Sequence, residues 1–258
     1  TKFNIILFYM SGHNKWSTIK RKKGALDAKR SKIFSKLAKE ITIAVKEGGG
    51  TDPSYNAKLR LAVQNAKGVN MPKDNIERAI KKGDQDGANF MEITFEGYAA
   101  HGIALFVECL SDNNNRTVSS VRAAFNKFNG TLGTNGSLSF LFERKGVFEI
   151  PKSDSINMDD FELEVIDAGA EDIESDDETI TVTCSFEDFG SLNKKFEELN
   201  IVPTCAELRR IPNDTKTISA DDAKGVLKLI DVLEDDDDVL NVFHNMEMTD
   251  EIIEAMDE

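Results

Sequence analysis

The stretch "ALDAKRSKIFSKLAKEITIAVKEG", residues 25–48, carries the strongest local fold signal in this 258-residue chain. Its apolar residues recur with the spacing of one face of an α-helix, and its lysines recur with the same period. At about 100° per residue the two stripes lie nearly back to back. The spacing predicts an amphipathic helix with one packed face and one lysine face, ended by the Gly48-Gly49-Gly50 run. The packed face is Ile33, Phe34, Leu37, Ile41, Ala44 and Val45, and the lysine face is Lys29, Lys32, Lys36, Lys39 and Lys46.

Two further helices are predicted after this one. Pro53 is typical of a first helical turn, and the apolar spacing after it predicts a helix that buries Tyr55. Pro72 is expected at the first position of a third helix, with Gly83 just past its end. Residues 10–83 are therefore expected to form a helical domain whose lysines face outward.

A basic run precedes the first helix in "SGHNKWSTIKRKK", residues 11–23. The whole chain has a net charge of −14. Met10–Lys82 nevertheless holds 18 Lys and Arg against 6 Asp and Glu, a net charge of +12. Residues 83–258 hold 13 against 40, a net charge of −27. A basic module joined to an acidic body indicates that one end of the chain meets a polyanion.

A lysine stripe alone is most often a solvated face, because lysine is seldom buried. Combined with the basic run and the +12 charge, it favours contacts to nucleic-acid phosphates. Trp16 could stack on a base or plug a helix junction, and the sequence leaves both open. The candidate nucleic-acid-binding residues are Lys15, Trp16, Lys20, Arg21, Lys22, Lys23, Lys29, Lys32, Lys36 and Lys39.

The acidic body has the patterns of mixed α and β structure. Residues 92–143 predict strand, strand, helix and strand, the last of them "SLSFLFER" at 137–144. Residues 144–212 predict a strand–helix–strand, twice, as in a ferredoxin-like sandwich. A late helix and strand would complete the first unit, so 84–143 plus 213–258 form one discontinuous domain and 144–212 an insertion. The expected fold class is α+β with three domains.

No catalytic, cofactor or metal motif is found in the sequence. The histidines lie in three separate segments without ligand spacing, and no nucleophile elbow or phosphate loop occurs. The cysteines are far apart and odd in number, which predicts packing residues in a reducing compartment. The histidines are His13, His101 and His244, and the cysteines are Cys109, Cys184 and Cys205.

Three other segments allow more than one interpretation. The acidic run Glu234–Asp238 suits a solvated turn, with a hard-cation site as the alternative. "SDNNNR", residues 111–116, favours a helix N-cap over a polar recognition loop. Residues 1–9 make a poor targeting signal, so they are expected to be an extension before a natural start at Met10.

Several long segments resemble the YebC/PmpR family. They are "SGHNKWSTIKRKKGALDAKRSKIFSKLAKEI", "NMPKDNIERAIKKG", "FEGYAAHGIAL", "DNNNRTVSSVRAAF", "GSLSFLFERKGV" and "DVLNVFHNM". The resemblance covers roughly Met10 to the C-terminus and implies a helical domain followed by two α/β domains, one inserted in the other. One departure is Ala99-Ala100, where family members often carry proline.

The resemblance implies a non-enzymatic, cytoplasmic, DNA-binding transcriptional regulator. Other members, including a mitochondrial translational activator of cytochrome oxidase subunit one, imply the alternative of a ribosome-associated factor that eases stalls on proline-rich sequences. The expected partner is duplex DNA, or else ribosomal RNA or the ribosome, since phosphate contacts alone do not separate them. No membrane partner is expected, because no apolar run approaches about 18 residues.

Overall fold

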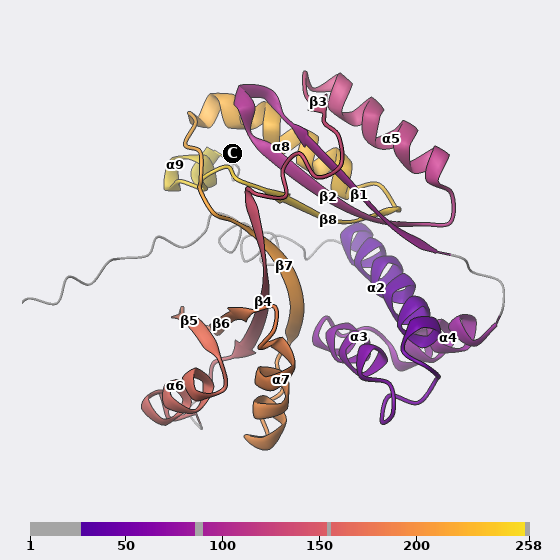
Figure 1. Ribbon diagram of the computed structural model, residues 1–258, viewed down its shortest axis with the longest axis vertical. Helices are drawn as coiled ribbons and strands as arrows, with labels where there is room; N and C mark the ends of the chain where they lie inside the picture. The colour runs from indigo at the N-terminus through magenta and orange to yellow at the C-terminus, as the bar shows by residue number, and fades with distance from the viewer. Residues whose placement is uncertain (1–26, 86–89, 154–155, 256–258) are drawn as a thin grey trace, which may run out of the picture.

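The computed structural model describes residues 27–85, 90–153 and 156–255. Figure 1 shows the elements in separate groups: a set of helices, a sheet backed by long helices, and a second sheet with shorter helices. The fold is α+β, and the described residues form three helices before the first sheet and two four-stranded antiparallel sheets. Within the described ranges no helix is long and apolar enough to cross a membrane.

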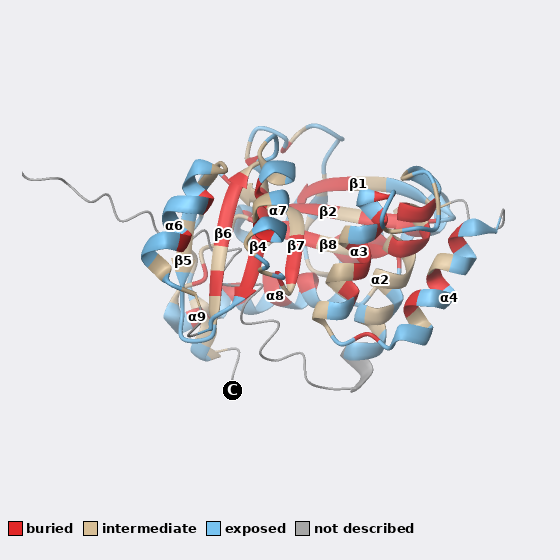
Figure 2. Ribbon diagram, turned by 90° about the horizontal axis from the view of Figure 1, so that it is seen from below, coloured by how far each residue is buried: buried red, intermediate tan, exposed pale blue. Residues whose placement is uncertain are grey.

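The N-terminal helices pack around one small core. They are α2 (Asp27–Glu47), α3 (Ala57–Gly68) and α4 (Lys73–Asp84). Ile41, Leu59 and Ile76 contribute one buried side chain from each helix. Figure 2 shows exposed residues along α4, whereas α2 is mostly intermediate or buried.

Three details of these helices differ from the prediction. The side chain of Asn56 accepts a hydrogen bond from the Leu59 amide at 2.9 Å, so α3 begins after this cap and Pro53 lies in the preceding turn. Tyr55 is consequently 91% exposed and not buried. Gly83 lies inside α4, where an added Cβ would stand 2.7 Å from the Thr42 carbonyl oxygen, so this glycine permits close packing of α4 on α2.

The first sheet combines strands from both ends of the acidic body. Its order is β3 (Thr131–Leu132), β1 (Met91–Tyr98), β2 (Ala104–Ser111) and β8 (Val239–His244). The short helix η1 (Ala100–Gly102) joins β1 to β2 at the Ala99-Ala100 loop. One face packs against α5 (Asn114–Lys127) and α8 (Ala220–Glu234), and α9 (Asp250–Ala255) extends that core. The inward side chains of α5 include Val121 and Phe125.

The second sheet has the order β5 (Ala170–Ser175), β6 (Thr179–Ser185), β4 (Phe142–Pro151) and β7 (Cys205–Pro212). Its helices are α6 (Met158–Asp167) and α7 (Phe189–Glu198). The chain order is therefore the predicted strand–helix–strand, repeated twice. The central strands are buried along much of their length in Figure 2.

The strand predicted over residues 137–144 is wrong for residues 137–141. The buried Glu96 carboxylate accepts hydrogen bonds from the Gly136 amide at 2.7 Å and the Leu138 amide at 2.5 Å, which hold this segment in a turn. The strand that follows, β4, starts only at Phe142 and belongs to the second sheet. The first sheet instead takes the two-residue β3.

The N-terminal helices are joined directly to the second sheet. The Asn65 side chain of α3 donates to the Ala206 carbonyl and accepts from the Ala206 amide, both at 2.9 Å, as a neighbouring strand would. At Gly68 an added Cβ would stand 1.8 Å from the Thr204 carbonyl oxygen, so only glycine allows this approach. These contacts fix α3 against β7.

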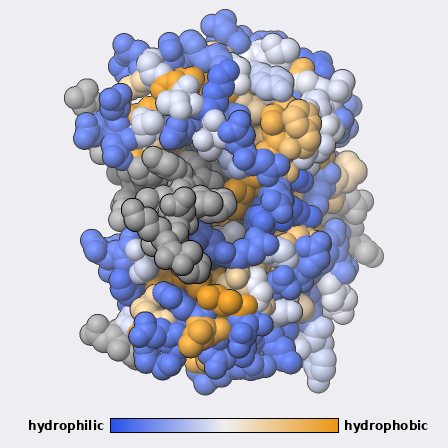
Figure 3. All heavy atoms as spheres, turned by 60° about the vertical axis from the view of Figure 1, so that its left-hand side comes forward, coloured by the Kyte–Doolittle hydropathy of each residue, from blue (hydrophilic) through white to orange (hydrophobic). Residues whose placement is uncertain are grey.

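One face of the surface is mainly hydrophilic, and the cysteines are buried in the interior. Figure 3 shows a face covered mainly by hydrophilic side chains, with apolar ones gathered in small patches. Cys109, Cys184 and Cys205 are all buried free thiols, which confirms the predicted packing role. Burial raises the pKa of Cys109 and of Cys184 to about 12, so these thiols stay protonated near neutral pH.

Candidate nucleic-acid interface

Most of the predicted phosphate-binding residues precede the described part of the chain. Lys15, Trp16, Lys20, Arg21, Lys22 and Lys23 lie outside the described residues. Lys29 lies in α2, but its side chain is also outside the description. Lys32, Lys36 and Lys39 are described, and all three lie on the same face of α2, at the helical spacing i, i+4 and i+7.

The sequence predicts that this lysine face is open to solvent. In the structure it contacts the acidic run between α8 and β8 instead. The Lys32 ammonium lies 2.7 Å from the Asp235 carboxylate. Lys36 donates to the Glu234 carbonyl at 2.9 Å. The predicted turn is present, and Asp235 and Asp237 are exposed in it, but the run also contacts lysines of α2 and buries Asp238.

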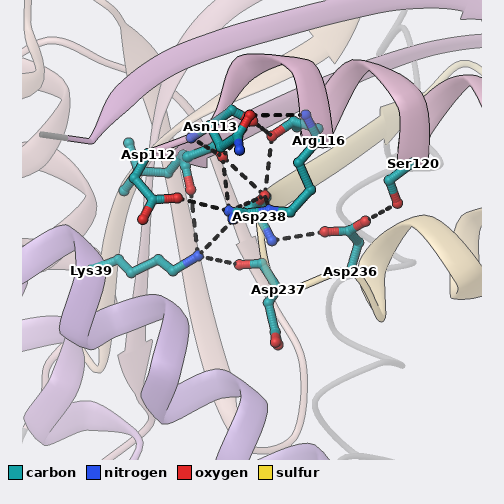
Figure 4. Close-up of polar contacts among 11 residues, drawn as sticks. Lys39, Asp112, Asn113, Arg116, Ser120, Asp236, Asp237 and Asp238 are labelled. Carbon is teal, nitrogen blue, oxygen red and sulfur yellow. Dashed lines mark hydrogen bonds and ion pairs between the residues drawn. The ribbon is translucent and has the colours of Figure 1, made fainter.

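Lys39 is more deeply held than Lys32. It donates to the Asp237 carbonyl at 2.6 Å and to the Asp238 carboxylate at 3.2 Å, and Figure 4 shows it reaching from α2 to this turn. Its side chain is only 19% exposed, against 40% for Lys32. Lys39 therefore ties α2 to the first sheet, whereas Lys32 sits at the open end of the contact.

The end of α8 explains why cations gather here. The last carbonyls of a helix have no partner within it and carry the negative end of the helix dipole. Lys36 bonds to the carbonyl of Glu234, the final residue of α8, and Lys32 bonds to the next carbonyl, that of Asp235, at 3.3 Å. Acidic side chains in the same turn add their own negative charge and so strengthen the attraction for the lysine ammonium groups.

Asp238 is the centre of a polar network that joins three elements (Figure 4). Its carboxylate, 5% exposed, accepts from Arg116 Nη2 at 2.7 Å, from Ser111 at 2.9 Å and from Thr117 at 3.1 Å, besides Lys39. Burial acts to raise the pKa of Asp238, but the bonds from Arg116, Ser111 and Lys39 outweigh it and hold that pKa below its ordinary value. Asp238 is therefore ionised and holds α2, β2 and α5 together through its carboxylate.

The segment preceding α5 supplies part of this network. The Asn113 side chain accepts from the Arg116 amide at 3.1 Å, which confirms the predicted N-cap. Asp112 also binds Arg116, at 2.9 Å. The polar residues of this segment thus order one another around the end of α5, and they bring Arg116 to Asp238.

A second carboxyl group lies where α2 meets both sheets. The pKa of Glu40 is raised to about 7, mainly by burial; the nearby carboxylates of Glu207 on β7 and Glu108 on β2 add to the rise, and Lys36 opposes it. The protonated form of Glu40 is therefore favoured in the folded protein below about pH 7. Sequence reasoning missed this group, because its partners lie far away in the chain.

Further cations on α4 were not among the predicted site residues. Lys81 and Lys82 are exposed in its last turn, and Lys82 lies 5.8 Å from the centre of the Phe90 ring. Lys39 approaches the same ring at 5.6 Å. The signal was present in "IERAIKKG", whose basic residues follow the helical period. Across the described residues no group of three or more His, Cys, Asp or Glu side chains is arranged to hold a metal ion.

Family models match almost the whole described chain. Residues 14–86 match that of the TACO1/YebC protein N-terminal domain, and residues 90–246 match that of the TACO1/YebC second and third domain. The chain belongs to the TACO1/YebC family. The predicted resemblance is thereby confirmed. The TACO1/YebC family is non-enzymatic, which also confirms the prediction that this chain is not an enzyme.

Individual relatives agree with the TACO1/YebC assignment over nearly their full lengths. A probable transcriptional regulatory protein of Amoebophilus asiaticus is 51% identical, with 92% of this chain and 98% of that protein covered. A similarly named protein of Brachyspira hyodysenteriae is 48% identical, with 95% and 100% covered. The crystal structure of a conserved hypothetical protein from Aquifex aeolicus matches with a TM-score of 0.81 at 40% identity, covering 93% of this chain and 99% of that one.

Proposed function

We propose that this chain is a non-enzymatic, nucleic-acid-binding regulator of gene expression, and that it regulates transcription by binding duplex DNA. The observation that carries the proposal is the charge segregation, +12 over Met10–Lys82 against −27 over residues 83–258. Lys and Arg clustered at one end release counterions from a phosphate backbone, and this release drives binding. The relatives are named probable transcriptional regulatory proteins, and these names support the same proposal.

The proposed contact surface begins in the basic run at 11–23 and continues along α2. Lys15, Lys20, Arg21, Lys22 and Lys23 would supply most of the phosphate contacts, with Trp16 beside them. Lys29, Lys32, Lys36 and Lys39 would extend this surface. The exposed Lys81 and Lys82 of α4 add cations on the same helical unit.

The domain bounds are part of the proposal. We assign residues 10–83 to the basic helical domain, 84–143 with 213–258 to a discontinuous α/β domain, and 144–212 to an inserted, ferredoxin-like one. The placement of β8 next to β2 supports the discontinuous assignment. The strand β4 begins at Phe142, two residues before the proposed insertion.

A second candidate function is a ribosome-associated translation factor. The acidic body favours it, because a charge of −27 should resist lying along a bare duplex and should suit a partner that also offers basic protein surface. Ribosomes combine exposed RNA with basic proteins. The same basic module would serve both candidates, because phosphate contacts carry no sequence information.

The test replaces Lys20, Arg21, Lys22 and Lys23 together by glutamate and measures binding to random duplex DNA and to RNA across a range of salt. Each lost phosphate contact should lower the log–log salt slope on duplex DNA by about 0.9. A matched control makes the same charge change on exposed lysines outside the basic module. These are Lys127→Glu, Lys152→Glu, Lys194→Glu and Lys228→Glu.

The first quadruple variant should bind far more weakly, with a smaller salt slope, and the control should lose much less. Equal losses in the two variants would mean that net charge alone matters and that the basic run is not the site. An unchanged slope in the first variant would refute the proposed surface.

A further inference from the structure

The lysine face of α2 is bound by another segment of the same chain. We call the run Glu234–Asp238 the acidic clasp. Lys32, Lys36 and Lys39 all bind it, through two carboxylates and three backbone carbonyls of the run. Three of the ten predicted phosphate-binding residues are thus engaged by a segment about 200 positions away in the chain.

The clasp presents its acceptors along α2 much as a phosphate backbone would. Lys32 and Lys39 are seven residues apart, which is about 10 Å along a helix axis. Over that length the clasp supplies a row of anionic or partly negative oxygen atoms, including the carbonyls at the end of α8. A nucleic-acid strand and the clasp would need the same lysine hydrogens, so the two cannot occupy this face together.

The two ends of the contact differ in strength. At one end the Lys32–Asp235 pair is 40% and 69% exposed, and an exposed pair of this kind contributes little and is screened by salt. At the other end the Lys39–Asp238 pair is 19% and 5% exposed and is held by the Arg116 network. The contact should therefore open first at Lys32, which is also the end nearer in sequence to the basic run at 11–23.

We infer that the acidic clasp is an autoinhibitory segment that competes with nucleic acid for the lysine face of α2. This inference rests on the proposed nucleic-acid-binding function. A ligand that needs the open form binds with an apparent affinity reduced by the open fraction, so the clasp weakens binding to non-specific sites. A nucleic acid that also engages the basic run would displace the clasp first at Lys32 and Lys36 and last at Lys39, whose pair with Asp238 is the more buried.

The test compares the full-length chain with the double variant Asp235→Asn and Asp237→Asn, measured on a random 30-base-pair duplex and on single-stranded RNA at about 0.15 M salt. Both side chains are exposed, so the fold should be retained. The matched control, Asp177→Asn with Glu187→Gln, removes the same two charges at exposed positions of the second sheet's turns. The clasp variant should bind about three- to five-fold more tightly, and the control should stay within about 1.5-fold of wild type.

Equal affinities of wild type, clasp variant and control, with clear binding by all three, would overturn the inference and leave the proposed function standing. No binding of DNA or RNA by any of them would overturn the proposed function, and the inference with it.

A second measurement uses the unaltered chain, in case the variant misfolds. Hydrogen exchange of residues 234–239 should rise when duplex is added, and unchanged or slower exchange in the bound protein would overturn the inference.

Discussion

Replacing Asp238 by asparagine should destabilise the fold much more than the same change at Asp237. The Asp238 carboxylate is 5% exposed and accepts from Arg116, Lys39, Ser111 and Thr117. Removing one member of a buried ion pair costs about 3–5 kcal/mol, because the other charge is left without its partner. Arg116 is 53% exposed and can turn to water, which lowers the expected loss to roughly 2–4 kcal/mol.

The assay is urea denaturation followed by circular dichroism at neutral pH, with both variants and the wild type. Asp237→Asn removes an exposed carboxylate of the same run and should change the free energy of unfolding by less than about 0.5 kcal/mol. The deficit of Asp238→Asn should shrink as the pH falls below about 3.8, because the pKa of this carboxyl is lower in the folded chain than that ordinary value and its stabilising charge is lost there. Equal stability of the two variants at neutral pH would refute the structural role of Asp238.

Other expected outcomes concern protonation, packing and thiol reactivity. Glu40 holds its proton more tightly in the folded protein, so wild-type stability should fall as the pH rises from about 4.5 to about 7, and Glu40→Gln should abolish that fall in a pH series of urea melts. Ile41→Ala should cost about 2–5 kcal/mol and Tyr55→Ala less than about 0.5 kcal/mol, since the first side chain is 0% and the second 91% exposed; the reverse order in thermal melts would contradict the packing. Cys109 and Cys184 should react with a thiol reagent at pH 8 only after denaturation, and rapid reaction of the native protein would contradict their burial.

Local pattern was enough to predict the helix α2, because its packed face is set by residues three and four positions apart. It was not enough to predict what covers the lysine face. Lys36 and Glu234 are 198 positions apart, and no periodicity in either segment indicates the other. The opposite charges of the two segments were visible in the sequence, but charge alone does not separate an internal partner from a polyanion outside the chain.

The errors around the helices and strands also have local physical causes. The side chain of Asn56 caps α3, so the helix starts after Asn56 and not at Pro53. Tyr55 therefore lies before the helix and is exposed. The local pattern at Gly83 predicts a helix end, but this glycine packs against Thr42 of α2, and sequence spacing does not show that α2 lies there. The turn before β4 is held by Glu96, a buried carboxylate from a distant strand. In each case the deciding contact is one that the segment's own pattern does not contain.

The central claim is that the basic N-terminal part directs this chain to DNA, and competition at about 0.15 M salt tests it most directly. Labelled promoter DNA bound to the full-length protein is challenged with random duplex DNA and, separately, with purified ribosomes. Charge alone gives non-specific dissociation constants of about 10⁻⁴–10⁻⁶ M. A DNA-binding transcriptional regulator should prefer its site over random duplex by roughly 10³-fold or more, and ribosomes should compete poorly. A ratio near one, with strong competition by ribosomes, would contradict the claim and favour the translation factor.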